Sequence, residues 1–227
     1  MRKELETKEI KKRKRPITGL ATEICIWKDE SECSDCNLHE KIFCRPKLKY
    51  LLMFALPMFF GLIPMVIGVI FANLELLFKI IFFGGWIGYS FFFFNVWESR
   101  MVCNHCPYYA NDEQKSLHCP IDKGKLKTSK YDPGPTSKSE KIQFAVGALI
   151  FVLYPIPFLI VGNLIPQLIL YSLGIIIWII VIQLKVCSDC INFACLMNRV
   201  PESVRNEFIK KNPVIRKAWE EKGYKFN

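Results

Sequence analysis

Three Cys-x-x-Cys motifs stand beside long apolar runs in this chain of 227 residues. They read ECSDC at 32–36, VCNHC at 102–106 and VCSDC at 186–190. A gap of two residues lets both thiolates, together with nearby backbone N–H groups, converge on one metal centre. Three such motifs therefore favour metal ligation over redox-active dithiols or thiols that only pack in the interior.

Further cysteines accompany each motif. Cys25 and Cys44 flank the first and give the pattern C-x7-C-x2-C-x7-C, whereas Cys119 and Cys195 trail the second and third. Nine of the ten cysteines thus form three triads along the chain, and Cys25 adds a fourth thiol to the first triad. All ten are candidate metal ligands: Cys25, Cys33, Cys36, Cys44, Cys103, Cys106, Cys119, Cys187, Cys190 and Cys195.

Two histidines lie directly next to candidate ligands. His105 precedes Cys106, and His118 precedes Cys119. Each could bind the same metal or hold a ligand in place by a hydrogen bond. The alternative for each histidine is an exposed loop position without a role.

The identity of the metal depends on the number of ligands and on their neighbours. Zinc takes four Cys or His ligands in a closed tetrahedron, which the first four cysteines would supply, as would the second and third motifs together. Iron–sulfur clusters are also held by cysteine thiolates. Cys106 and Cys119 are each followed by proline, as is the last cysteine of the bacterial ferredoxin run. This proline favours an iron–sulfur cluster, with zinc as the alternative.

The motifs lie next to long stretches without charged side chains, and the helices that these stretches form must position the motifs. Residues 51–72 and 142–184 are runs of 22 and 43 residues that contain no Asp, Glu, Lys, Arg or His. About 20 helical residues cross a bilayer, so the longer run must fold back, and the turn residues of GNLIPQ at 162–167 mark the place. Between these runs lies a third, interrupted only by Lys79. We predict an all-α integral membrane protein with four transmembrane helices at 50–72, 76–97, 143–162 and 165–185.

The four predicted helices form two tandem hairpins, and each hairpin is followed by a Cys-x-x-Cys motif. VCNHCPYYA at 102–110 matches VCSDCINFA at 186–194 in Val, both Cys, one aromatic residue and Ala. An internal repeat would bring both motifs to the same surface as a cysteine-rich cap. Within the first hairpin, Gly84 and Gly88 form a G-x-x-x-G step, which predicts close helix packing.

The distribution of Lys and Arg predicts the orientation. Of the 31 basic residues, 13 lie before residue 50, eight lie between 98 and 141, and nine lie from 185 onward. The positive-inside rule places these three segments in the cytoplasm. We therefore expect a multi-pass protein of the cell (cytoplasmic) membrane, with both termini and all cysteines in the cytoplasm. Thiols stay reduced there, so disulfides are disfavoured.

The predicted organisation has hairpins that alternate with polar segments. The last segment contains PESVRNEFIKKN and PVIRKAWEEKG, which predict two short amphipathic helices that cover the cysteine region. The segments are a basic tail at 1–19, a cysteine-rich cytoplasmic segment at 20–49, a transmembrane hairpin at 50–97, a cysteine-rich cytoplasmic loop at 98–141, a second hairpin at 142–186 and a C-terminal cytoplasmic segment at 187–227.

The predicted transmembrane helices contain few side chains that could bind haem or relay protons or ions. The predicted spans contain no His, Asp, Glu or Arg, so transmembrane haem and intramembrane proton or ion relays are not expected. Nucleic acid is not an expected partner, because the basic tail has no interleaved aromatic residues. The favoured hypothesis is an oxidoreductase subunit that transfers electrons at the membrane to or from a cytoplasmic redox protein or a quinone. The alternatives are a zinc-stabilised membrane scaffold or docking protein and, third, a metal-handling or transport protein.

Overall fold

The structure is a computed structural model that describes residues 19–33, 36–121 and 124–226. Within these ranges the regular elements are helices, and a bridge between Ser116 and Leu126 is an isolated β-type pairing. The prediction of an all-helical chain with four helices suited to a bilayer is confirmed. The four segments that are long and apolar enough are Leu48–Phe71, Leu76–His105, Lys138–Val161 and Ile165–Lys185.

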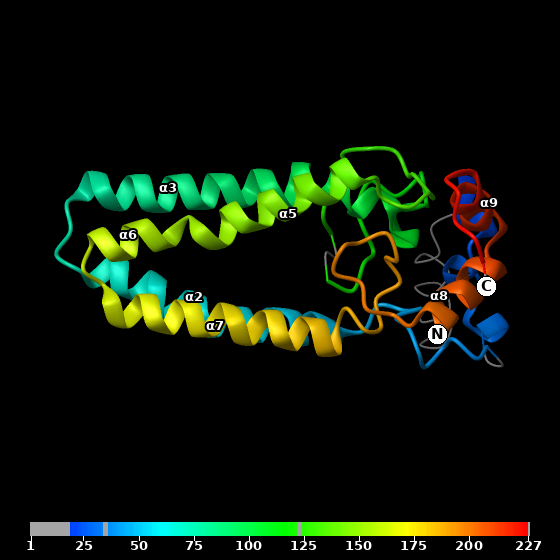
Figure 1. Ribbon diagram of the computed structural model, residues 1–227, viewed down its shortest axis with the longest axis horizontal. Coiled ribbons are helices and arrows are strands. Elements are labelled where there is room, and N and C mark those ends of the chain that lie inside the picture. The colour runs from blue at the N-terminus through cyan, green and yellow to red at the C-terminus, as the bar shows by residue number, and fades with distance from the viewer. Residues whose placement is uncertain (1–18, 34–35, 122–123, 227) are drawn as a thin grey trace, which may run out of the picture.

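The four long segments contain the following elements (Figure 1). The first is α2 (Leu48–Phe71). The second is α3 (Leu76–Phe92), which continues through a π-helical turn (Phe93–Trp97) into α4 (Glu98–Met101). The third comprises α5 (Lys138–Leu153) and α6 (Pro155–Val161), and the fourth is α7 (Ile165–Lys185). Two shorter helices follow, α8 (Glu202–Lys211) and α9 (Pro213–Glu221).

A capping box and a proline set the limits of the third segment. The hydroxyl of Ser137 accepts a hydrogen bond from the N–H of Glu140, whose carboxylate accepts one from the N–H of Ser137. These bonds satisfy two N–H groups at the start of α5, so the helix begins before residue 143. Pro155 has no N–H and stands in the first turn of α6, which divides the segment at Tyr154.

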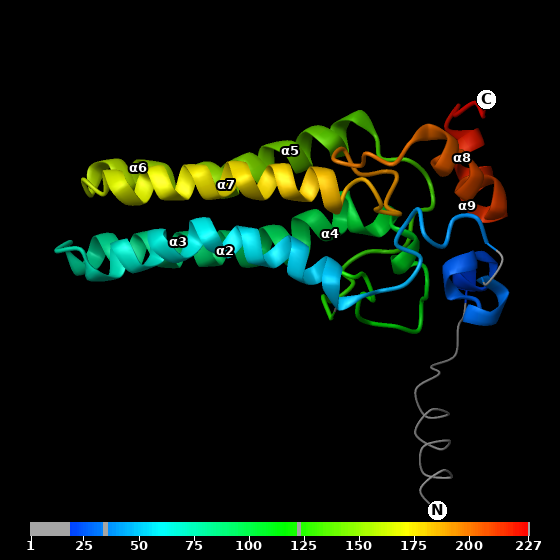
Figure 2. The ribbon, with the colours of Figure 1, turned by 90° about the horizontal axis from the view of Figure 1, so that it is seen from below.

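Each long helix of the first predicted hairpin packs against a helical segment of the second. α2 lies along α7, while α3 lies beside α5 and α6 (Figures 1 and 2). Large apolar side chains point outward from the bundle, as Phe71 and Leu76 show with exposed fractions of 83% and 73%. Such extensive apolar exposure is typical of a surface covered by lipid.

Gly61 of α2 and Gly174 of α7 let these two helices approach closely. A Cβ atom added to Gly174 would collide with the backbone of Gly61, so only glycine at position 174 allows this contact. The predicted packing of Gly84 and Gly88 is wrong, because a Cβ added to either one meets no described atom within 4 Å. This side of α3 therefore faces away from the bundle.

The two ends of the bundle differ. The short turns after α2 and α6 lie at one end, and the segments that carry the cysteines lie at the other (Figures 1 and 2). At the cysteine end, α8 and α9 bury Phe208, Ile209 and Trp219 in a core shared with Ile24 and Ile191. The two short C-terminal helices are present as predicted, whereas the cysteine-rich cap that they would cover stays a prediction. The tandem repeat and the segment boundaries stay predictions.

Candidate functional site

The cysteines line two cavities at one end of the bundle. Four of them line a cavity of about 350 Å³ and form the N-terminal cysteine group: Cys25, Cys33, Cys36 and Cys44. The other six line a cavity of about 490 Å³ and form the bundle-end cysteine group: Cys103, Cys106, Cys119, Cys187, Cys190 and Cys195. The second and third triads of the sequence thus share one cavity, whereas the first triad and Cys25 have their own.

Short turns present the N-terminal cysteine group. A 3-10 turn begins at Cys25 (Cys25–Trp27), and another ends at Cys33 (Glu30–Cys33). The N–H of Cys36 donates to the carbonyl of Cys33 at 3.2 Å, which closes the Cys-x-x-Cys turn. Burial, together with the other thiols of the group, raises the pKa of Cys44 to about 12. The four side chains therefore lie close enough to influence one another electrostatically.

Side-chain donors contact the sulfur atoms of this group. The ammonium of Lys211 lies 3.4 Å from Cys36 Sγ, and the guanidinium of Arg45 lies 3.9 Å from Cys33 Sγ. Asn212 is fully buried, and its amide Nδ2 lies 3.5 Å from Cys25 Sγ. Its Oδ1 also accepts a hydrogen bond of 2.7 Å from the N–H of Cys25. Burial has the larger effect at Cys25 and raises the pKa of its thiol, although the hydrogen bond from the Asn212 amide acts in the opposite direction.

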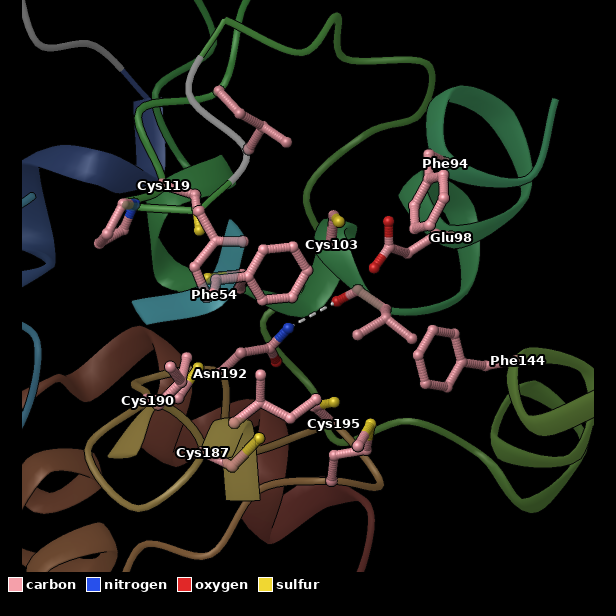
Figure 3. Close-up of a pocket in the computed structure, with 18 of the residues that line it drawn as sticks. Phe54, Phe94, Glu98, Cys103, Cys119, Phe144, Cys187, Cys190, Asn192 and Cys195 are labelled. Carbon is pink, nitrogen blue, oxygen red and sulfur yellow. Dashed lines mark hydrogen bonds between the residues drawn. The ribbon is translucent and has the colours of Figure 1, made fainter. Parts of the chain in front are cut away.

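The bundle-end cysteine group is assembled from two parts of the chain. Figure 3 shows Cys103 and Cys119, from the segment after α4, on one side of the cavity. Cys187, Cys190 and Cys195, from the segment after α7, lie on the other side (Figure 3). The two parts are tied together by Asn192, whose Nδ2 donates a hydrogen bond of 3.0 Å to the carbonyl of Val102.

This group also has N–H donors close to sulfur. Lys125 Nζ lies 3.7 Å from Cys103 Sγ and forms an ion pair of 2.7 Å with Glu98, and Gln183 Nε2 lies 3.9 Å from Cys187 Sγ. Burial raises the pKa of the Cys187 thiol to about 11 and that of Cys195 to about 12. At Cys195, hydrogen bonds from backbone N–H groups partly offset the effect of burial on the pKa and favour the thiolate.

Tyr108 lines the cavity of the bundle-end cysteine group. Its hydroxyl donates a hydrogen bond of 2.7 Å to the carbonyl of Phe43. Burial raises the pKa of this hydroxyl, and so do thiols of both groups, among them Cys106 and Cys44. The side chain of one tyrosine is therefore close to both sets of thiols.

The two histidines among the predicted ligands lie outside both cavities. His105 is buried, with Nδ1 2.8 Å from the carbonyl of Gly134 and Nε2 3.5 Å from a carboxylate oxygen of Glu140. His118 Nδ1 lies 3.3 Å from the carbonyl of Ser116. A role of either histidine in metal binding stays a prediction. His39, which was not among the predicted ligands, lines the cavity of the N-terminal cysteine group.

The donor set at both cavities is chemically suited to a metal, but ligation stays a prediction. Among the described residues, no three His, Cys, Asp or Glu side chains are grouped closely enough to hold a single ion. The sequence analysis missed Lys211, Asn212, Lys125 and Asn192. These are single polar residues without a motif, so they gave no signal. In comparisons with known proteins, no family, curated protein or solved structure matches the chain.

Proposed function

We propose that this protein carries electrons at a cytoplasmic membrane surface through iron–sulfur clusters held by the two cysteine groups. The observation that carries the proposal is the arrangement of all ten cysteines around two cavities at one end of the bundle. Iron–sulfur clusters take four cysteine ligands, and the two groups offer four and six thiols. When bound, such clusters supply one-electron redox chemistry.

The N–H donors close to the sulfur atoms support a cluster. Hydrogen bonds to the ligand sulfurs tune the reduction potential of iron–sulfur centres. Lys211, Arg45 and Asn212 are placed to do this at the N-terminal cysteine group, and Lys125 and Gln183 at the other.

The membrane orientation completes the proposal. Two tandem hairpins would cross the cytoplasmic membrane and carry a cysteine-rich cytoplasmic cap. Support comes from the common position of the cysteine segments at one bundle end and from the Lys and Arg that these segments carry. A cytoplasmic redox protein could exchange electrons with the N-terminal cysteine group, because Cys33 and Cys36 are only partly buried. Within the bilayer, a quinone is the natural partner.

A zinc-stabilised scaffold is the second candidate, and the N-terminal cysteine group favours it. Four thiols around one cavity match the ligand number of a structural zinc site. Such a site would hold the loops at 19–47 against α8 and α9 without any electron transfer.

Anaerobic purification followed by visible spectroscopy and analysis of iron, sulfide and zinc tests the proposal. We expect broad visible absorption, with iron and sulfide in equal amounts. The double variants C33S/C36S and C187S/C190S should each remove part of the iron, and the quadruple variant should remove nearly all of it. A colourless protein with stoichiometric zinc would overturn electron transfer and support the scaffold.

A further inference from the structure

A collar of exposed basic residues surrounds the bundle at the end that carries the cysteines. Each of the four long helical segments contributes to it at this end (Figures 1 and 2). Lys47 and Lys49 lie at the start of α2, Arg100 lies in α4, Lys138 is the first residue of α5, and Lys185 is the last residue of α7. We call these five residues the basic collar, and all five side chains are exposed.

The basic collar lies at the edge of the apolar surface of the bundle. Leu48, between Lys47 and Lys49, is 69% exposed, and Leu184, directly before Lys185, is 58% exposed. Exposed apolar side chains on membrane helices are covered by acyl chains. Long basic side chains beside such a surface place their charges in the headgroup region. The collar therefore lies at the depth of the lipid phosphates.

The acidic residues near these helix ends are engaged by other partners. Glu98 forms the ion pair of 2.7 Å with Lys125. The carboxylate of Glu140 accepts the N–H of Ser137 at 2.7 Å and lies 3.5 Å from the ring of His105. Within the described part of the chain, none of the five collar residues forms an ion pair. The collar charges are therefore available to anions outside the protein.

The opposite end of the bundle has no such collar. The turns at 72–75 and 162–164 contain no Lys or Arg. Lys79, in the first turn of α3, donates a hydrogen bond of 2.8 Å from Nζ to the carbonyl of Ile70, so its ammonium is held by the end of α2. The exposed positive charge is thus confined to the cysteine end.

We propose that the basic collar binds anionic phospholipids in preference to zwitterionic ones. Each Lys or Arg near an anionic lipid surface contributes about five-fold to the affinity, equivalent to about 1 kcal/mol. A zwitterionic headgroup such as that of phosphatidylcholine adds a positive charge, which offsets the attraction of its phosphate. The inference goes beyond the proposed function and does not depend on it, because no collar residue is a candidate metal ligand.

Native mass spectrometry of the purified protein in detergent tests the proposal. The probes are phosphatidylglycerol and phosphatidylcholine with identical acyl chains, added in equal amounts. We expect phosphatidylglycerol to be preferred by about five-fold for each bound lipid, the contribution of one basic residue. Equal binding of the two lipids would overturn the proposal. Inorganic phosphate at constant ionic strength should leave the bound lipid in place, and displacement would show that the collar binds free anions instead.

A collar variant and a matched control locate the site. The collar variant replaces all five collar residues by Gln and should lose the preference for phosphatidylglycerol. The control changes the net charge equally at five exposed lysines outside the four long segments, and it should keep the preference: Lys41, Lys115, Lys130, Lys217 and Lys225. An equal loss in both variants would show an effect of net charge alone and contradict the proposal. The basic tail at 1–19 is common to both variants, so a preference that persists in the collar variant would come from the tail and would also contradict it.

Two smaller changes keep the test decisive if the collar variant does not fold. Lys47→Gln/Lys49→Gln removes only the charges at the start of α2 and should lower the number of bound phosphatidylglycerol molecules. Lys130→Gln/Lys217→Gln removes two charges outside the long segments and should leave that number unchanged. Circular dichroism in detergent measures the helix content of each variant. The same number of bound lipids in both pairs would refute the role of the collar.

Discussion

The backbone N–H of Phe43 donates a hydrogen bond of 2.7 Å to the carbonyl oxygen of Asp189. Phe43 directly precedes Cys44, and Asp189 lies between Cys187 and Cys190. The carbonyl of Phe43 in turn accepts the hydroxyl of Tyr108, which follows Cys106 by two positions. The buried Phe43 thus joins the segment that carries Cys44 to the segments that carry the second and third motifs.

Removal of the Tyr108 hydroxyl should weaken this connection. Tyr108→Phe leaves the buried carbonyl of Phe43 without its donor, at a cost of about 1 kcal/mol. For a chain of this size we expect the Tm in detergent to fall by about 2–4 °C. Tyr131→Phe is the matched control, because the buried Tyr131 hydroxyl has no partner among the described residues. Its Tm should stay the same or rise, and an equal loss in both variants would contradict the role of the Phe43 bond.

Lys211 should set the reduction potential of a cluster in the N-terminal cysteine group. Its ammonium is 3.4 Å from Cys36 Sγ, and a nearby positive charge stabilises the reduced, more negative state. Lys211→Met should lower the potential by roughly 20–60 mV, because a charge near 4 Å contributes about 1 kcal/mol in a largely aqueous setting. An anaerobic redox titration followed by electron paramagnetic resonance measures the shift. Lys217→Met removes the same charge from an exposed position of α9 and should leave the potential nearly unchanged. Equal potentials in both variants would exclude this role.

Asn212 should be required for the N-terminal cysteine group specifically. Asn212→Leu removes its bonds to the N–H of Cys25 and to the carbonyl of Phe208, which leaves two polar groups unsatisfied at about 1–3 kcal/mol each. We expect loss of the iron held by that group and retention of the iron at the bundle end. Asn206→Leu is the control, because Asn206 is also buried but bonds Tyr224 rather than a cysteine. If both variants lose iron equally, the effect comes from α8 as a whole and not from Asn212.

The membrane helices could be predicted because their signal is local. A span needs only an uncharged run of sufficient length, and the predicted span 50–72 differs from α2 by two residues at its start. The sequence SKSEK at 137–141 predicts a serine cap for the third membrane helix, and Ser137 forms it in a capping box, so α5 begins five residues before the apolar span 143–162.

The spacing of the cysteines allowed the first four to form one site and the second and third motifs to form another, but it did not decide this grouping. Cys119 and Cys195 are far apart in the sequence but line one cavity, because the Asn192–Val102 bond joins their loops. Lys211 and Asn212 reach the first group only because α8 and α9 fold back onto it. These contacts depend on tertiary packing, for which neither motif nor periodicity gives a signal.

The contact between Gly61 and Gly174 should matter more than the G-x-x-x-G step. Gly174→Ala places a methyl group against the backbone of Gly61 and should force α2 and α7 apart, at a cost of about 1–3 kcal/mol. Gly84→Ala has open space and better helix propensity, so it should be neutral or slightly stabilising. Thermal unfolding in detergent compares the two variants. Greater destabilisation by Gly84→Ala would mean that this face of α3 is covered in the membrane by another chain.

The orientation of the bundle can be tested with reporter cysteines at its two ends. Asn73 lies exposed in the turn after α2, and Lys225 lies exposed near the C-terminus at the opposite end. A membrane-impermeant maleimide applied to intact cells should label Asn73→Cys, whereas Lys225→Cys should react only after permeabilisation. Peptide mass spectrometry separates each reporter from the native cysteines. Labelling of Lys225→Cys in intact cells would place the cysteine groups in an oxidising compartment, where thiol–disulfide chemistry would replace metal ligation as the better explanation of the motifs.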